Sequence, residues 1–302
     1  MFIPKFLKKP DQVINNVEIP IHSFLFSQTG NIDPKTVDSF GEEWKKFHSF
    51  DRQEIEKIGS DYFDILPESL KNKQVSVLDV GCGSGRWAAY VAPFVGHIDC
   101  IDPSIAVYSA SKLLKDYENV RISRVDLDNL PFPDDSYDLV YSLGVLHHIP
   151  DTALAMRKCV EKVKPGGYFL VYLYYKLDNR GIIFKSIFQM SAVLRKMISK
   201  SPAGIKKLVC DGIAVLAYWP LARTARLAHK FGLKNLSKKM PLSYYQDKSF
   251  WIMKNDALDR FGTPLEQRFS RTEIEQMMKN SGLTNIKFSE KEPYWHAIGQ
   301  KL

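Results

Sequence analysis

Cysteines are scarce in this sequence, and none of them forms a close pair. The four residues Cys82, Cys100, Cys159 and Cys210 make no Cys-x-x-Cys pair and no zinc-ligand spacing, which argues against a disulfide framework or a zinc module. No apolar run approaches the ~18 residues that a membrane-spanning helix needs. The basic start, MFIPKFLKKPDQ, lacks the apolar stretch and cleavage site of a signal peptide. We therefore expect a reduced, cytoplasmic protein without a bound metal.

Acidic residues are nearly missing from one segment of the chain. Between Arg180 and Lys239 there are 13 lysines and arginines but a single acid, Asp211. The formal net charge of the whole chain is only +8, so the positive charge is concentrated in this segment rather than spread evenly. The chain as a whole has 302 residues, 45% of them hydrophobic, which is enough for a packed core and excludes a disordered protein.

One predicted helix in this segment, residues 221–234, has a cationic stripe. Its members recur at helical spacing and are Arg223, Arg226, Lys230 and Lys234. The stripe has two interpretations. It is either a solvated basic face or a contact for an anion, which would be a phosphorylated or nucleotide-linked molecule or the headgroups of a membrane.

From residue 74 onward, the pattern alternates between strands and helices. Buried strands are predicted at residues 74–80, 96–102, 119–126, 136–143 and 167–175. The segments between them include helical patterns, one of which begins at Asp151 as N-cap and stops before Pro165. Such alternation predicts a parallel sheet with helices on both faces, a doubly wound α/β fold. Ligands of these sheets bind at the carboxyl ends of the strands.

The pattern of predicted strands and helices divides the chain into four parts. Residues 1–55 hold few strand signals and are expected to form an N-terminal helical lid. Residues 56–177 form the core, and residues 178–264, which have helical periodicity only, form an inserted helical cap on the substrate side. Residues 265–302 contain a helix opened by the capping box Ser270-x-x-Glu273 and two strands that complete the core sheet.

A glycine-rich loop follows the first strand of the core in VLDVGCGSGRW, residues 77–87. Its glycines, Gly81, Gly83 and Gly85, have the spacing G-x-G-x-G rather than the G-x-G-x-x-G of a dinucleotide site. The strand also carries Asp79, which would repel a pyrophosphate. A ligand with a positive charge at this point removes the conflict, and S-adenosylmethionine has an α-ammonium group and no phosphate.

Two further acids end the next two strands. Asp102 lies where a carboxylate accepts hydrogen bonds from both ribose hydroxyls. Asp126 follows the third strand, where a carboxylate can accept from the adenine amino group. Each acid alone could be a cap or a turn residue. Three acids after three successive strands fit a nucleoside with an ammonium tail.

The stretches VLDVGCGSGRW, CIDPSIAVYSASK, VDLDNLPFPDDSYDLVYSLGVLHHIPD and VEKVKPGGYFLVY resemble the class I S-adenosylmethionine-dependent methyltransferases of the type-11 kind. The resemblance covers residues 74–175. It implies a Rossmann-like sheet of seven strands in the order 3-2-1-4-5-7-6, with the last strand antiparallel. DSFGEEWKKF, residues 38–47, also resembles a helix that covers the cofactor in some members.

The resemblance also implies a set of cofactor contacts. The methionine part would lie at Asp79 and the glycine loop, including Cys82, and the ribose at Asp102 and Pro103. The adenine would lie at Asp126 and the backbone of Leu127, and Ser142 would lie beneath the sulfonium.

The two histidines after the fourth strand, His147 and His148, are the candidates for a catalytic base. Methyl transfer to a hydroxyl needs a group that takes its proton. On a helical turn adjacent side chains point about 100° apart, so one ring could face the methyl group while the other packs inward. Both could also be structural. Tyr174, Tyr245 and Trp251 are candidates for the acceptor pocket, although packing would explain each of them equally well.

The leading functional hypothesis is O-methylation of a small or carrier-linked molecule, such as a sugar, a polyketide or a quinone-like compound. Alternatives are an RNA methyltransferase that uses the basic cap and a protein that binds S-adenosylmethionine without catalysis. No Asp/Asn-Pro-Pro-Tyr/Phe motif follows the fourth strand, and no RNA-binding domain is recognisable, so we do not expect a nucleic-acid partner.

Overall fold

The computed structural model describes residues 2–24, 30–46, 52–176, 195, 197–199 and 201–302. The chain divides into two compact units, Met1–Asp178 with Leu265–Leu302, and Asn179–Pro264. We call them the core unit and the helical unit and describe each by itself.

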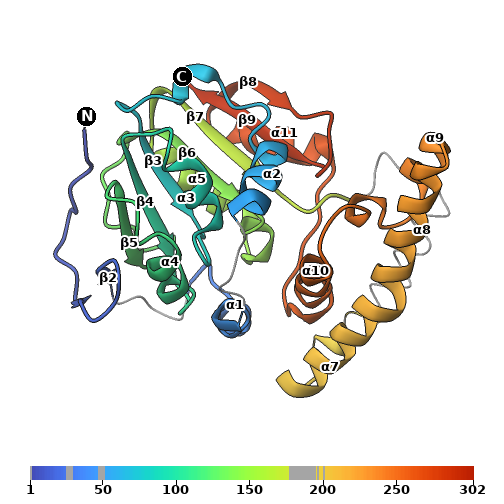
Figure 1. The fold of residues 1–302 in the computed structure, drawn as a ribbon. Helices are drawn as coiled ribbons and strands as arrows, with labels where there is room; N and C mark the ends of the chain where they lie inside the picture. Colours follow the sequence, from blue (N-terminus) through green and yellow to red (C-terminus); the bar gives the residue numbers. More distant parts are fainter. Residues whose placement is uncertain (1, 25–29, 47–51, 177–194, 196, 200) are drawn as a thin grey trace. The chain divides into compact units, whose positions relative to one another are not determined.

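The core unit is built on one sheet whose strands lie side by side in Figure 1. Its order is β1-β2-β5-β4-β3-β6-β7-β9-β8. The five central parallel strands are β3 (Ser76–Val80), β4 (His97–Asp102), β5 (Val120–Arg124), β6 (Tyr137–Leu143) and β7 (Val163–Tyr172). The last two are β8 (Leu283–Phe288) and β9 (His296–Lys301), and β9 runs antiparallel to β7. The seven-stranded arrangement expected from the resemblance is therefore confirmed as the inner part of a larger sheet.

Two further strands extend the sheet beyond β5 and were not expected. They are β1 (Gln12–Ile14) and β2 (Ile21–Ser23), an antiparallel pair of which β2 runs parallel to β5. Residues 1–55 were expected to be a helical lid, so this part of the expectation was wrong. Each strand has three residues, too few to give a recognisable alternation of apolar and polar side chains. Helix α1 (Pro34–Lys46) follows in the same segment.

Helices cover both faces of the sheet because successive strand residues point to opposite sides. Val77 belongs to a buried cluster that includes residues of α2 (Arg52–Tyr62), α3 (Arg86–Val91) and α4 (Val107–Leu113). Its neighbour Leu78 belongs to the opposite cluster, which includes α5 (Thr152–Glu161) and α11 (Arg271–Asn280). The predicted caps are confirmed, since Asp151 accepts from the Leu154 amide and Ser270 forms a capping box with Glu273. Helix α5 ends at Glu161, and the stretch Pro165–Gly167 lies within β7 rather than beyond a longer helix.

The helical unit contains no strand among its described residues. Helix α7 (Ala203–Ile213) continues through a π-helical segment, η3 (Ala214–Tyr218), into α8 (Trp219–Lys230). The π segment ends two residues before Pro220, which has no N–H to donate to the carbonyl four positions earlier and whose ring would clash with that carbonyl in a regular α-helix. Helices α9 (Lys234–Lys239) and α10 (Phe250–Gly262) complete the unit, with the short turn η4 (Ser243–Tyr245) between them. No helix in the described part of the chain is both long and apolar enough to cross a membrane.

Candidate active site

Three carboxylates lie at the carboxyl ends of three neighbouring strands. Asp79 is in β3, Asp102 ends β4 and Asp126 follows β5. Figure 1 shows these strands next to one another, in agreement with their pairing. The topology therefore brings all three predicted acids to one edge of the sheet.

The glycine loop turns sharply at the end of β3 and is held by β4. The amides of Gly81 and Cys82 both donate to the Ile101 carbonyl, at 2.8 and 2.9 Å. Gly81 has a φ of +75°, and a Cβ there would lie 2.5 Å from the Val145 side chain. Gly81 is therefore required by the close approach of the segment after β6, whatever ligand binds at the loop.

Asp79 is an almost completely buried carboxylate beside this loop, with 1% of its surface exposed. Its Oδ2 accepts no hydrogen bond from any described residue. Burial raises the pKa of Asp79 to about 8, and the nearby Tyr141 hydroxyl only partly opposes this rise. A cation placed here would return the carboxyl to its charged form and satisfy the buried oxygen. These properties fit the α-ammonium group of S-adenosylmethionine.

Asp102 is already tied into the loop. Its Oδ2 accepts from the Gly83 amide at 3.0 Å, and its Oδ1 accepts from the amide and the hydroxyl of Ser104 at 2.8 and 2.6 Å. Desolvation raises the pKa of Asp102, although these hydrogen bonds favour the charged form. Because each carboxylate oxygen can accept two hydrogen bonds, Oδ2 retains capacity for a ribose hydroxyl.

The remaining predicted cofactor residues surround this edge. Asp126 is buried, and its Oδ1 accepts from the Asp128 amide and the Asn129 side chain. Pro103 and Leu127 are half-buried and directly follow Asp102 and Asp126. Ser142, in β6, is fully buried and donates to the Val80 carbonyl at 3.0 Å.

Cys82 is buried in the loop itself. A hydrogen bond with Cys100 and burial raise the pKa of the Cys82 thiol well above its usual range. It therefore remains a neutral thiol near pH 7 and contributes shape and packing rather than a nucleophile.

His147 and His148 lie on the short turn η2 (Leu146–His148) after β6 and are both buried. Their ring centroids lie 4.0 Å apart and their planes form an angle of 49°, so the two rings pack against each other. His147 stacks on Tyr174, with centroids 4.0 Å apart and planes at 27°. The Nδ1 atom of His148 lies 2.7 Å from the Leu265 carbonyl. A carbonyl only accepts, so Nδ1 carries the proton and the lone pair of the neutral ring is on Nε2.

Residues far away in the sequence position this histidine turn, and sequence reasoning missed them. The Gln267 amide donates to the His147 carbonyl, and its side chain donates to the Ile149 carbonyl. The Phe40 ring, on α1, meets His148 edge-on at 4.9 Å. The Thr36 hydroxyl accepts from the Leu265 amide at 3.3 Å. No local motif marks these residues, because their role depends on a fold that joins positions more than 100 residues apart.

The three aromatic candidates for the acceptor pocket fall in different units. Tyr174 belongs to the core unit, is buried and carries the Arg268 guanidinium 5.3 Å above its ring. Tyr245 is buried in the helical unit, where its hydroxyl accepts from Arg260 at 3.3 Å and its ring meets Tyr218. Trp251 is half-buried on α10. Packing within each unit thus accounts for much of the environment of Tyr174 and Tyr245.

Comparison with known proteins supports a cofactor site at this edge of the sheet. The family model described as "Methyltransferase domain" matches residues 78–171, the stretch that contains the glycine loop, the three acids Asp79, Asp102 and Asp126, and the histidine turn. These residues form a class I S-adenosylmethionine-dependent methyltransferase domain.

Relatives of the methyltransferase domain share about a third of its residues. An uncharacterized methyltransferase of Bacillus subtilis is 34% identical over 106 residues, which are 34% of this chain and 42% of that protein. A ubiquinone biosynthesis O-methyltransferase of Marinobacter nauticus is 36% identical over 110 residues, 34% of this chain and 44% of the relative. The chain therefore spans less than half the length of these two curated relatives.

The fold of the methyltransferase domain also occurs in solved structures. Human N-acetylserotonin methyltransferase, solved in complex with S-adenosylmethionine, aligns with a TM-score of 0.50 and 15% identity, over 87% of this chain and 56% of that one. This likeness concerns the fold. S-adenosylmethionine is the cofactor of the methyltransferase domain, in agreement with the acids and glycines found at its edge.

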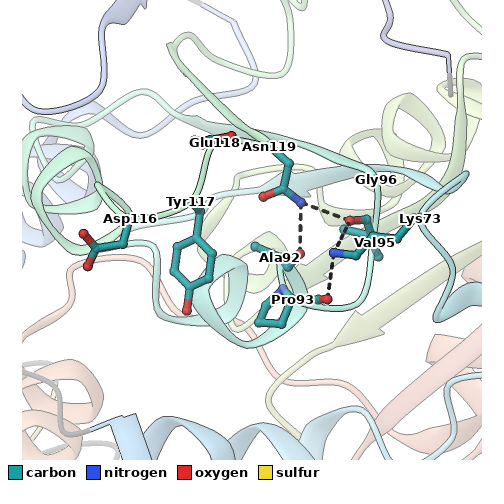
Figure 2. Close-up of a pocket in the computed structure, with 9 residues that line it drawn as sticks. All are labelled: Lys73, Ala92, Pro93, Val95, Gly96, Asp116, Tyr117, Glu118 and Asn119. Carbon is teal, nitrogen blue, oxygen red and sulfur yellow. Dashed lines mark hydrogen bonds between the residues drawn. The ribbon is translucent and has the colours of Figure 1, made fainter.

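A hollow on the opposite edge of the methyltransferase domain has a different character. It has a volume of about 510 Å³ and lies where β4 and β5 begin (Figure 2). Lys73 donates to the carbonyls of Pro93 and Val95, and Asn119 donates to those of Ala92 and Val95. These side chains tie neighbouring loops together at the amino ends of the strands. The hollow is therefore remote from the three acids and serves local structure.

Proposed function

We propose that this chain is a methyltransferase that transfers the methyl group of S-adenosylmethionine to a hydroxyl of a small or carrier-linked molecule. The observation that carries the proposal is the pair of carboxylates, Asp79 and Asp102, on either side of the Gly81–Gly85 loop. Asp79 is buried and has a carboxylate oxygen without a hydrogen bond, which a cation would satisfy. Asp102 is oriented by hydrogen bonds from Gly83 and Ser104.

The residues of the chain divide the work of binding. Asp79 would pair with the α-ammonium group, Asp102 would accept from the ribose, and Asp126 would accept from the adenine amino group. When bound, S-adenosylmethionine supplies a methyl group that is already activated on a sulfonium. The chain then has to align the acceptor and keep water out.

We assign the role of base to His148 and a supporting role to His147. The Leu265 carbonyl fixes the proton of His148 on Nδ1, so Nε2 can take the proton of an acceptor hydroxyl. His147 is fully buried, stacks on Tyr174 and contacts the His148 ring at an angle of 49°, which suits it to hold the neighbouring ring in place. The alternative is that His147 is the base, and mutation of each histidine in turn would distinguish the two assignments.

A small-molecule acceptor agrees with the names of several relatives. They include ubiquinone biosynthesis O-methyltransferases, a sterol 24-C-methyltransferase and a 27-O-demethylrifamycin SV methyltransferase. Those acceptors belong to those proteins, and the common element is a small molecule. An acceptor of this class with an anionic carrier would also suit the basic residues of the helical unit.

The test combines cofactor binding with turnover. Titration calorimetry should show binding of S-adenosylmethionine and none of NADH. Incubation with labelled cofactor and a small-molecule extract should transfer label to an organic-soluble product, and nuclease treatment of the extract should not change the yield. Label that appears only in RNA would overturn the proposed acceptor class, and binding without any transfer would favour a non-catalytic protein.

A further inference from the structure

The helical unit has a long rod with one buried side. Helices α7 and α8 and the π segment between them form one continuous run from Ala203 to Lys230 (Figure 1). The residues of the buried side recur at helical spacing and are Cys210, Ala214, Tyr218, Ala222 and Ala225. Ala214, Tyr218 and Ala222 form one cluster with Met253 and Ala257 of α10. This side of the rod makes the core of the unit.

The other side of the rod is apolar and exposed. Leu216 is 81% exposed, Leu208 74% and Trp219 49%. Six apolar residues on this side are at least 49% exposed, and we call them the exposed apolar face: Ile205, Leu208, Val215, Leu216, Trp219 and Leu227. Single exposed apolar residues are normal on protein surfaces, but several on one side of one helix mark an interaction surface.

Basic residues predominate around the exposed apolar face. The single acid of the rod, Asp211, pairs with Lys207 and with Lys254 of α10, which places it toward the buried side. Beyond the face, the exposed basic residues are Arg226, Lys230, Lys234, Lys238 and Lys239. Exposed Phe231, Leu233 and Leu236 alternate with them.

The cationic stripe expected from the sequence needs a correction here. The Arg223 guanidinium donates to the carbonyls of Gln246 and Lys248, at 3.0 and 3.4 Å, so it serves the interior of the unit. Arg226 lies 3.6 Å from the Asp247 carboxylate. Lys230 and Lys234 keep the exposed positions that the stripe predicted.

We propose that the helical unit docks on an anionic lipid surface through the exposed apolar face, with the rod lying in the plane of the interface. Interfacial helices combine Leu, Phe and Trp on one side with Lys and Arg beside them, and Trp prefers the headgroup level. A protein partner would fit less well, because lysines are depleted in protein interfaces. The proposal goes beyond methyl transfer and does not depend on it.

Vesicle flotation tests the proposal without any activity measurement. The full chain is mixed with phosphatidylcholine vesicles or with vesicles that also contain phosphatidylglycerol. The double variant Leu208→Gln/Leu216→Gln removes two exposed apolar side chains and should lower partitioning onto the anionic vesicles by roughly tenfold or more. The matched control is Leu7→Gln/Leu302→Gln, which changes two exposed leucines of the core unit, 68% and 83% exposed, and should partition like the unmodified chain.

Two further readouts distinguish the outcomes. Trp219 fluorescence should shift to the blue on anionic vesicles, and Trp219→Phe should remove the shift while binding persists. Lys230→Glu/Lys234→Glu should weaken binding at low salt, where screening is least. The proposal is overturned if the unmodified chain stays off the vesicles, or if Leu208→Gln/Leu216→Gln binds as well as its control. Light scattering that shows a dimer broken by the same variant, without vesicle binding, would assign the face to a second copy of the chain.

Discussion

The core unit buries charged groups, whereas the helical unit exposes apolar ones. Asp79 is 1% exposed at the end of β3, and Leu216 is 81% exposed on the rod. Both reverse the usual preference, in which carboxylates face water and leucines pack inside. Neither reversal helps the chain to fold, since a buried carboxyl oxygen without a hydrogen bond costs free energy and an exposed leucine contributes no burial.

The difference between the units indicates what each one meets. A buried acid at a sheet edge favours a cation that enters the fold, and we propose that this cation is the ammonium group of S-adenosylmethionine, the cofactor of the methyltransferase domain. An exposed apolar face beside lysines favours a broad surface that the rod contacts from outside. The predictions below test this contrast, beginning with the largest expected effect.

Asp79→Asn should change stability and cofactor affinity in opposite directions. The folded-state pKa of Asp79 is about 8, above its ordinary value of 3.8, so the folded protein holds a proton that the unfolded chain releases. Stability should therefore fall as pH rises between these values, by about 1.4 kcal/mol per pH unit. The asparagine remains neutral, so urea denaturation of the variant should lack this slope.

The same substitution should lower the affinity for the cofactor, whereas it removes the loss of stability at higher pH. The ammonium group needs the Asp79 carboxylate in its charged form, so the affinity of the unmodified chain should rise as pH approaches 8. Asp79→Asn should weaken binding by about 1–3 kcal/mol. If the variant binds the cofactor normally by calorimetry, Asp79 does not meet the ammonium group. If the variant keeps the same slope of stability with pH, Asp79 is not the group whose titration causes that slope.

His148→Gln should lower kcat by roughly a hundredfold or more, because a general base typically contributes this much. The affinity for S-adenosylmethionine should stay unchanged. His97→Gln is the matched control, since His97 is also buried but contacts Asp99 near the beginning of β4. Should His148→Gln turn over the acceptor at a near-native rate while His147→Gln does not, the roles of the two histidines are exchanged.

Asp102→Asn should weaken cofactor binding by about 2 kcal/mol, within the range for a lost charge-assisted hydrogen bond. The change keeps the shape of the side chain but gives up one acceptor oxygen. Asp138→Asn provides the comparison, because Asp138 accepts from the Ser76 amide and pairs with Lys164 at the opposite edge of the sheet. Titration calorimetry of both variants should show an effect for Asp102 alone, and equal losses would mean that general destabilisation explains them.

The sequence predicted the parts of the fold that repeat regular patterns. Continuous apolar strands, the glycine loop and the capping box at Ser270 are local signals, and the structure agrees with each of them. The strands β1 and β2 were not predicted, because three residues are too few to show an alternation of apolar and polar side chains. The fixed tautomer of His148 was not predicted either, since it depends on the carbonyl of Leu265, 117 positions away.

The helical unit shows a second limit of sequence reasoning. Helical spacing correctly groups Arg223 with Arg226 on a similar side of α8, but spacing does not say which neighbours the fold supplies. The carbonyls of Gln246 and Lys248 turn Arg223 into a structural residue. Likewise, periodicity finds an apolar side on the rod, and only the packing of α10 shows that a second apolar side remains exposed.

The smallest expected effect distinguishes two neighbouring arginines within the helical unit. Arg223→Ala removes a half-buried guanidinium that donates to two backbone carbonyls, and we expect a loss of about 1 kcal/mol in the stability of this unit. Arg226→Ala removes an exposed ion pair with Asp247 at 3.6 Å and should change stability by less than about 0.5 kcal/mol. Hydrogen exchange of the amides in α8 and α10 measures both changes. Equal protection in the two variants would show that Arg223 does not hold the loop at residues 246–248, and the original stripe of four equivalent cations would then be the better description.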